Sequence, residues 1–380
     1  MNIVYFLGAG ASANAIPTIN GIRTRIYDLQ VYLSKYLKEN LNEAAFQGLN
    51  TILKDNQNIL FKIIEELKWL YVQTEHHQTV DTFAKKLFLH ESNDLKKLKR
   101  ALISYFYFEQ SMKFEWAENK ISEFNGYENL LDLRYDSLLA NIIHRKSGKL
   151  EFEDNLNIIT WNYDLQIDIA LKNYFNLPLN EIKDSLRIHP NRNSFDLPIG
   201  DLIVKEKFQV IKLNGNAFLD YGLQNGSVET IYDKSRNEQD TQAIIAMYLD
   251  ELTNEFGKEM RLLDSAAFKY FNFAWESHEN FGSNYIGRNN VIESAKKIID
   301  TADVLIVIGY SFPSFNFDID KYLFTNISLK ELIIQDENPD YIKERMKPLL
   351  KQMYSPNHKD NPTFNYTPIQ ISQYFPIYKY

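Results

Sequence analysis

Five short apolar runs are spaced along the chain, and each has the length and composition of a buried strand. They cover Asn2–Leu7, Leu156–Trp161, Phe208–Leu213, Val304–Ile308 and Glu331–Gln335. The four later runs are nearly continuous rather than alternating, which is typical of strands that are buried on both faces. Helical patterns separate the runs, and strands that alternate with helices predict an α/β fold with helices on both faces of a parallel sheet.

The segment between the first two runs is far longer than a simple crossover between parallel strands needs. Apolar residues recur in it at helical spacing, as at Ile22, Ile26 and Leu29. We therefore predict a large helical insertion at about 20–150. A second insertion, at about 216–290, also has a mostly helical pattern.

The two insertions leave one domain and a tail. Residues 1–355 are expected to form a single Rossmann-like α/β domain that carries both insertions. Residues 356–380 contain four prolines and are expected to form an extended C-terminal tail, with a final edge strand at Pro368–Ser372.

The charge balance argues against nucleic acid as a partner. Among the 380 residues there are 42 Lys and Arg and 50 Asp and Glu, which gives a net charge of −8. An acidic protein lacks the electrostatic attraction to phosphates that dominates nucleic-acid binding, so direct binding is not expected. The basic run of Lys96, Lys97, Lys99 and Arg100 is interpreted as a solvated helix face, with a local nucleic-acid contact as the alternative.

Cysteine is absent from the chain, which excludes disulfides, thiolate zinc sites, iron–sulfur clusters and a catalytic thiol. No histidine pair stands at metal-ligand spacing beside a carboxylate, so no metal site is expected. The first residues show no signal-peptide pattern, and the longest apolar run, Val304–Ile308, is too short to span a bilayer. A soluble, cytoplasmic protein is therefore expected, with no membrane partner.

A glycine-rich turn follows the first predicted strand. Gly8, Ala9, Gly10 and Ser12 stand between this strand and a helix. Small residues let the backbone approach a phosphate, and a helix N-terminus offers free N–H groups and the positive end of its dipole. The alternative is a tight strand–helix turn that simply needs glycine, since the third glycine usual in dinucleotide-binding loops is missing.

Four further motifs end the other predicted strands. They are Thr160-Trp-Asn162-Tyr-Asp164, Lys212-Leu-Asn214-Gly, Gly309-Tyr-Ser311, and the acidic turn at Asp336. Ligands of doubly wound sheets bind outside the carboxyl ends of the strands, so these residues are candidates for one common site. Each motif alone also fits a helix cap or a turn, and it is their shared position that favours a site.

Taken in order, the five motifs resemble the sirtuin (silent-information-regulator) family. The matching features are Gly-Ala-Gly-Ala-Ser with Ile-Pro shortly after, Thr-x-Asn-x-Asp, Lys-Leu-x-Gly, Gly-Tyr-Ser-Phe and the acidic turn. The resemblance spans about 3–340 outside the insertions, and the Asn-Tyr-Asp and Gly-Tyr-Ser-Phe-Pro variants look most like the bacterial antiphage branch. It implies that the domain at 1–355 binds NAD.

The resemblance also implies roles for the residues of these motifs. Asn162, Asp164 and Asn214 hold the implied catalytic positions, with Asn162 orienting a water or the nicotinamide ribose. The implied contacts to the rest of NAD are Gly8, Ala9, Gly10, Ser12, Pro17, Thr160, Gly309, Ser311 and Asp336.

Two departures separate this chain from the deacetylases of the family. Their zinc ribbon needs four cysteines, so no zinc is expected here. Their general-base histidine is replaced by Asn214, and loss of a general base typically costs ~10²–10⁴-fold in rate. Three interpretations are open: an engineered substitution that traps NAD, a native residue of a weaker enzyme, or a chain that binds NAD without turnover.

The leading functional prediction is an NAD-hydrolysing effector that cleaves the nicotinamide–ribose bond in antiphage defence, with abortive infection as the outcome. Such a destructive effector must be held off until it is triggered, so a homo-oligomer or a partner is expected to control it. The resemblance implies a HerA-type ATPase or an Argonaute-like protein as that partner. The alternative is a catalytically silent subunit that binds NAD or ADP-ribose within a larger defence complex. Asn214 is the residue that supports this alternative.

Overall fold

The computed structural model describes residues 1–40, 51–111, 131–153, 155–175, 186–189, 208–217, 244–246, 248–249, 271, 273–279, 286–351, 354–355, 358–370 and 374–378. The chain divides into two compact units. The first unit comprises Met1–Ala13, Leu131–Asn216 and Asn272–Tyr380, and the second comprises Asn14–Leu130 and Ala217–Phe271.

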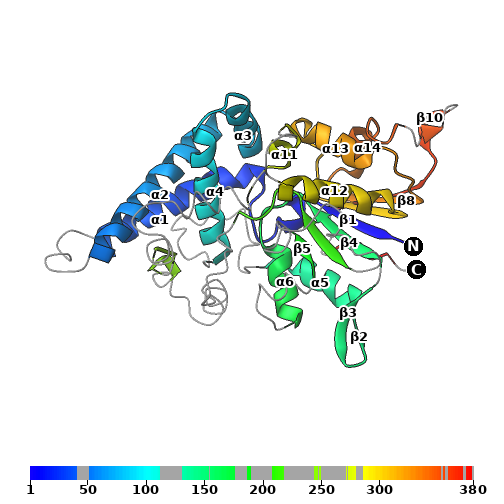
Figure 1. Ribbon diagram of the computed structural model, residues 1–380, viewed down its shortest axis with the longest axis horizontal. Coiled ribbons are helices and arrows are strands. Elements are labelled where there is room, and N and C mark those ends of the chain that lie inside the picture. The colour runs from blue at the N-terminus through cyan, green and yellow to red at the C-terminus, as the bar shows by residue number, and fades with distance from the viewer. Residues whose placement is uncertain are drawn as a thin grey trace. The chain divides into compact units, whose positions relative to one another are not determined.

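A seven-stranded sheet forms the centre of the first unit (Figure 1). Every neighbouring pair of its strands is parallel. The order across the sheet is β11-β8-β7-β1-β4-β6-β5. In chain order the strands are β1 (Ile3–Leu7), β4 (Leu156–Thr160), β5 (Ile188–His189), β6 (Gln209–Lys212), β7 (Val304–Ile308), β8 (Glu331–Asp336) and β11 (Asn365–Gln370).

The five strands expected from the apolar runs are all present. β7 has the predicted bounds, β1, β4 and β8 differ from the prediction by one residue at one end, and β6 is shorter by one residue at each end. Two further strands lie at the edges of the sheet. β5 has only two residues, too few to give a pattern, and β11 begins at Asn365 rather than at Pro368.

The strand order places a topological switch point beside β1. From β1 the chain adds β4 and then β6 on one side, and it later adds β7, β8 and β11 on the other. This is the order of the doubly wound dinucleotide-binding fold, with β5 added outside β6. In such sheets the ligand crevice lies at the carboxyl ends of the two strands where the order reverses, and these strands are β1 and β7.

Helices cover both faces of the sheet, which confirms the predicted Rossmann-like α/β architecture. Figure 1 shows α5 and α6 on one face and α12, α13 and α14 on the other. Ile3, Tyr5 and Leu7 join the core under α5 and α6, whereas the ring of Phe6 lies 5.2 Å from that of Phe324 in α13. The remaining elements of the unit are η1 (Ala9–Ser12), α5 (Leu133–Ile142), β2 (Ile143–Lys146), β3 (Lys149–Phe152), α6 (Gln166–Phe175), α11 (Ala274–Glu279), α12 (Ile286–Asp300), η4 (Ser314–Asn316), α13 (Phe317–Phe324), α14 (Pro339–Met346), β9 (Tyr354–Ser355) and β10 (His358–Pro362).

An antiparallel hairpin, β2–β3, lies within the stretch predicted to be a helical insertion. Its turn consists of Ser147 and Gly148, and both have positive φ, as a type I′ hairpin turn requires. Residues 131–152 therefore form helix α5 and a hairpin in the first unit, although the helical pattern is predicted to extend to about residue 150.

Four helices are described in the Asn14–Leu130 part of the second unit, and ion pairs that are buried or partly buried join three of them. Arg25 of α1 pairs with Glu109 of α4 at 3.2 Å, and Arg100 of α4 pairs with Glu66 of α2 at 2.5 Å. Most of the second predicted insertion, about 216–290, lies outside the described residues. None of the described helices is both long and apolar enough to cross a membrane. The four helices are α1 (Ile19–Asn40), α2 (Thr51–Glu75), α3 (Val80–Leu89) and α4 (Asp94–Ser111).

The basic run at the start of α4 is not the solvated face that we predicted. Lys99 is buried, because its position on the helix faces the interior of the second unit. Arg100 is held by Glu66, and Lys97 Nζ lies 4.3 Å from the centroid of the Trp69 ring. Of the four residues, Lys96 alone is exposed.

Candidate functional site

The glycine loop, residues 8–12, leaves β1 and turns into the short helix η1. It is held against the loop that follows β7. The Gly8 N–H donates to the Ile308 carbonyl at 3.0 Å, and the Gly10 N–H donates to the Gly309 carbonyl at 3.0 Å. Gly309 has a φ of +59°, which glycine adopts without strain. The two strand ends at the switch point are therefore joined through their backbones.

No side chain fits where these two loops meet. A Cβ on Gly8 would lie 2.6 Å from the Gly309 carbonyl oxygen, and one on Gly10 would lie 2.7 Å from Gly309 Cα. The packing of the two loops therefore requires glycine at both positions. The N–H groups of Gly8 and Gly10, which were expected to bind a phosphate, already donate to carbonyl groups of the protein. The outer rim of the loop remains accessible, because Ala9 is exposed and Gly10 is half-buried.

Ser12, at the end of η1, lies at the centre of a buried polar cluster. Its Oγ accepts from Asn162 Nδ2 at 3.2 Å and lies 3.2 Å from the Tyr135 hydroxyl. A turn at the end of β4 positions Asn162, whose N–H donates to Thr160 Oγ1 at 3.0 Å. Among the described residues, no group donates to Asn162 Oδ1. This oxygen is therefore available to a ligand or a water.

Asp164 is buried beside the cluster and has an altered acidity. Burial raises the pKa of its carboxyl group, while the Lys212 charge and hydrogen bonds from the Gln166 N–H and the Ser12 hydroxyl act in the opposite direction. The Gln166 N–H donates to Asp164 Oδ1 at 3.0 Å. The carboxyl group is thus linked to the polar cluster through Ser12, and its raised pKa suits it to exchange a proton.

Lys212, at the end of β6, is a structural residue of the site. Its Nζ donates to Asp168 Oδ2 at 2.7 Å and to the Asp164 carbonyl at 2.5 Å, and both side chains of the ion pair are fully buried. The ion pair fixes the segment between β4 and α6 to β6. Because the ammonium group is occupied, it does not serve a ligand phosphate.

Asn214 holds the implied general-base position, and it bridges three segments. Its Nδ2 donates to the Trp161 carbonyl at 2.9 Å, and its Oδ1 accepts from the Ala274 N–H, at the start of α11, at 2.9 Å. The side chain is 5% exposed. A neutral amide takes up no proton near neutral pH, and both ends of this amide are in use. The geometry therefore gives Asn214 a positioning role.

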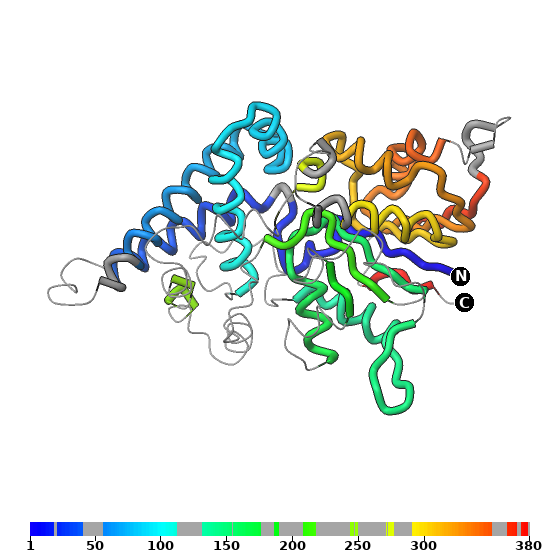
Figure 2. The backbone as a smooth tube through the Cα atoms, viewed as in Figure 1, coloured from blue at the N-terminus to red at the C-terminus, as the bar shows by residue number. Residues whose placement is uncertain are grey.

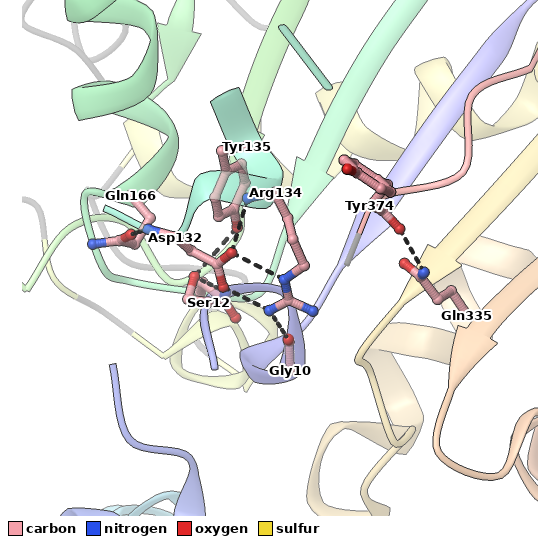
Figure 3. Close-up of polar contacts among 9 residues, drawn as sticks. Gly10, Ser12, Asp132, Arg134, Tyr135, Gln166, Gln335 and Tyr374 are labelled. Atoms are coloured by element: carbon pink, nitrogen blue, oxygen red, sulfur yellow. Dashed lines mark hydrogen bonds and ion pairs between the residues drawn. The ribbon is translucent and has the colours of Figure 1, made fainter. Parts of the chain in front are cut away.

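Three residues at the start of α5 complete the cluster and were missed by the sequence analysis (Figure 3). The Asp132 carboxylate accepts two hydrogen bonds from the Arg134 guanidinium, at 2.9 and 2.6 Å. Arg134 Nη2 also donates to the Gly10 carbonyl at 2.9 Å, and the Tyr135 hydroxyl lies against Ser12. Asp132 could be recognised in the sequence as a helix cap from its residue type. The contact from Arg134 to Gly10 spans 124 residues, so it gives no local pattern in the sequence.

Beyond Gly309 the β7 loop has a buried and an exposed part. Tyr310 stacks on Trp161, with 5.6 Å between ring centroids, and its hydroxyl donates to Asp320 Oδ2 at 2.9 Å. Burial raises the pKa of Asp320 well above its usual value, against the hydrogen bonding from the Tyr310 hydroxyl. Ser311, in contrast, is exposed, so its hydroxyl is accessible to a ligand.

Two of the residues that the resemblance implies as NAD contacts, Asp336 and Pro17, have other structural surroundings. Asp336 ends β8, and its Oδ1 accepts from the Asn338 N–H at 3.0 Å, which shapes the turn into α14. Its carboxylate is half-buried. Pro17 is buried in the second unit.

The fold and the strand-end residues define a Rossmann-like α/β protein with a buried polar cluster at its switch point. Within the described ranges, no three His, Asp or Glu side chains are grouped as a metal site requires. No protein-family model matches the chain, and no curated protein matches it as a relative.

Proposed function

We propose that the first unit binds NAD at the switch point and hydrolyses its nicotinamide–ribose bond. The observation that carries the proposal is the Ser12–Asn162 hydrogen bond of 3.2 Å. It joins the glycine loop, which lies at the switch point where doubly wound sheets bind dinucleotides, to the end of β4, the neighbour of β1 on the other side. The resemblance of the five motifs to the sirtuin family supports the choice of NAD over other nucleotides.

The diphosphate would lie against the rim of the glycine loop, at Ala9 and Gly10. Lys212 and Arg134 are both paired with carboxylates, and the Gly8 and Gly10 N–H groups donate within the protein. Phosphate binding would therefore depend on hydroxyl donors and on the remaining N–H groups at the rim of the loop. Ser311 at the end of β7 is suited to donate to a phosphate. Asp336 at the end of β8 is suited to accept from ribose hydroxyls.

Hydrolysis of the N-glycosidic bond passes through an oxocarbenium-like state. Nicotinamide leaves as a neutral molecule, because the bond that breaks joins C1′ to a pyridinium nitrogen. In the proposed reaction Asn162 Oδ1 orients a water, whose oxygen bonds to C1′ of the ribose. The proton released from the water goes to Asp164, so the products are ADP-ribose and nicotinamide. Asn214 has no part in the proton transfer.

The biological role follows from the resemblance. We propose that the chain depletes cytoplasmic NAD in antiphage defence and that abortive infection is the result. A homo-oligomer, and a HerA-type ATPase or an Argonaute-like protein as partner, would hold the activity in check until infection. Zinc has no place in the proposal, because the chain has no cysteine for a ribbon.

A second candidate function is a silent subunit that binds NAD or ADP-ribose. Asn214 favours it, because both ends of its amide are occupied by Trp161 and Ala274. In this case Asn162 and Ser12 would hold the ligand, and no bond would break.

One assay separates the two candidates. The purified chain is incubated with NAD, alone and with each candidate partner, and nicotinamide release is measured for the wild type, Asn162→Ala and Asn214→His. Release by the wild type that is lost in Asn162→Ala supports hydrolysis. Asn141→Ala, on the exposed face of α5, is the matched control and should keep the wild-type rate.

Binding without release supports the silent subunit. Isothermal titration calorimetry with NAD and with ADP-ribose measures this directly. The absence of binding and of release in every arm would reject both candidates.

A further inference from the structure

Residues 374–378, called the strap here, run beside β1 near the end of the described chain (Figure 2). The Tyr5 hydroxyl of β1 donates to the Pro376 carbonyl at 3.0 Å. Gln335 Nε2 of β8 donates to the Tyr374 carbonyl at 2.8 Å, as Figure 3 shows. These two hydrogen bonds fix the backbone of the strap to the sheet, on the face that α5 and α6 cover.

One side chain of the strap, Phe375, enters the core. It is 2% exposed, whereas the neighbouring Tyr374 is 61% exposed. The guanidinium carbon of Arg134 lies 5.0 Å from the centroid of the Phe375 ring. The Tyr135 ring meets the same ring edge to face, at 5.2 Å and 87°. A single ring thus supports two consecutive residues of α5.

These two residues are the ones that hold the glycine loop. Arg134 Nη2 donates to the Gly10 carbonyl at 2.9 Å, and the Tyr135 hydroxyl lies 3.2 Å from Ser12 Oγ. Gly10 and Ser12 both lie in η1. Phe375 therefore contacts both of the α5 side chains whose polar atoms meet η1 in these contacts.

The ring does more than fill volume. The Arg134 side chain is 6% exposed, and its guanidinium edge is bound by Asp132. Its face is then covered by Phe375, which is the arrangement in which a desolvated cation gains from an aromatic ring. Loss of the ring would leave both the guanidinium and the Tyr135 ring without the surface that orients them.

We propose that Phe375 is a positioning residue for the glycine loop, and that the strap couples the end of the chain to the switch point through Arg134 and Tyr135. A change that lifts the strap would loosen the glycine loop without touching any residue of the loop. The effect on NAD rests on the proposed function, whereas the effect on the loop does not.

Hydrogen exchange of the full chain tests the effect on the loop. Phe375→Ala should speed the exchange of the Gly8 and Gly10 amides at least tenfold, because these amides donate across the loop contact. Phe375→Leu keeps much of the buried apolar volume and should give a smaller increase in the exchange rate. If Phe375→Ala does not fold, Phe375→Leu takes its place in the experiment. Tyr374→Ala, with its exposed side chain, should exchange like the wild type.

A second control separates positioning from general loss of stability. Met346 is buried in α14, on the opposite face of the sheet. Met346→Ala should lower the melting temperature while the exchange of the glycine loop stays slow. The proposal would be overturned if amide exchange in the glycine loop became equally fast in Met346→Ala and Phe375→Ala. It would also be overturned if neither Phe375 variant changed the exchange rate.

NAD binding provides the second arm. The dissociation constant for NAD should rise about tenfold in Phe375→Ala and stay at the wild-type value in Met346→Ala. If the wild type itself binds no NAD, the proposed function fails, and the exchange experiment still decides the role of the strap.

Discussion

The side-chain amide of Asn162 donates to the Ser12 hydroxyl across 3.2 Å and joins two segments that are 150 residues apart in the chain. The Ser12 Oγ also lies 3.2 Å from the Tyr135 hydroxyl. Ser12→Ala removes the partner of both groups, and a buried polar group left unpaired costs about 1–3 kcal/mol. We expect a lower melting temperature and about tenfold weaker NAD binding, since each 1.4 kcal/mol or so is tenfold in affinity.

Thermal melts and calorimetry measure both effects of Ser12→Ala. Ser137→Ala, at a half-buried position of α5, is the control and should behave like the wild type. Equal affinity for NAD in the two variants would remove Ser12 from the site.

Asp164→Asn removes the proposed proton acceptor with little change of shape. The kcat of nicotinamide release should fall about 10²–10⁴-fold, while the affinity for NAD stays nearly unchanged. Burial raises the pKa of Asp164, and a base acts only when deprotonated. The wild-type rate should therefore increase with pH through this raised pKa, and the variant should lack that step. Asp136→Asn is the control, and a full rate in Asp164→Asn would exclude Asp164 as the base.

Gly309 and Gly148 form a matched pair for testing the contact between the loops. Both have left-handed φ, +59° and +83°, which costs an alanine about 1–2 kcal/mol. Gly148→Ala meets nothing within 4 Å, whereas a Cβ on Gly309 would lie 2.5 Å from Gly10 Cα. Gly309→Ala should therefore be clearly the less stable variant in chemical denaturation and should bind no NAD. Equal free energies of unfolding would contradict the close approach of the loops.

Asp132→Asn leaves the buried Arg134 without its ion-pair partner. The two side chains are 0% and 6% exposed, and breaking a buried pair typically costs about 3–5 kcal/mol. Glu344 and Lys347 offer a surface comparison at 2.7 Å, with 60% and 25% exposure. Glu344→Gln should cost less than about 1 kcal/mol. Urea denaturation of both variants measures the difference in the free energy of unfolding. Similar midpoints would contradict a larger contribution of the buried Asp132–Arg134 pair.

His189 makes the stability of the first unit depend on pH. Burial lowers the pKa of its imidazole from 6.5 to about 4, and the Arg187 charge acts in the same direction. Between pH 6.5 and about pH 4 the imidazole is protonated in the unfolded chain but not in the folded chain. The contribution of His189 to the free energy of unfolding is therefore complete above pH 6.5 and is lost as the pH falls towards 4. The resulting decrease in the free energy of unfolding is about 3 kcal/mol.

Urea denaturation between pH 4 and pH 7 measures this dependence. His189→Gln, which does not titrate, should show a flatter decrease on acidification. Parallel curves for the wild type and the variant would show that His189 does not titrate in this way.

The centre of the sheet could be predicted from the sequence because burial there is uniform. β7 is buried at every residue, so its apolar run has no interruption and its bounds are unambiguous. β5 has two residues, and its place beside β6 depends on pairing rather than on its own pattern. Lys99 was misjudged because a basic side chain gives no sign of its own burial, which is set by the packing around α4.

The site could be predicted only where a motif and a strand end coincide. The glycine loop, Asn162 and Asp164 were proposed in this way, and the Ser12–Asn162 contact joins the first two. The contacts of Arg134 and Phe375 could not be found, because each joins segments that are distant in the chain and of ordinary composition. The occupied amide of Asn214 also needed coordinates, since a residue type does not reveal its partners.

The central place of β1 has a consequence for the synthesis of the chain. Ile3 pairs with Leu156 on one side and with Val304 on the other. At about 5–20 residues per second, the roughly 300 residues that separate β1 from β7 take about 15–60 s to translate. Until β4 and then β7 are synthesised, the unpaired edges of this apolar strand are a template for association with other chains. The yield of folded protein should therefore depend on chaperones that shield β1 until both neighbours have left the ribosome.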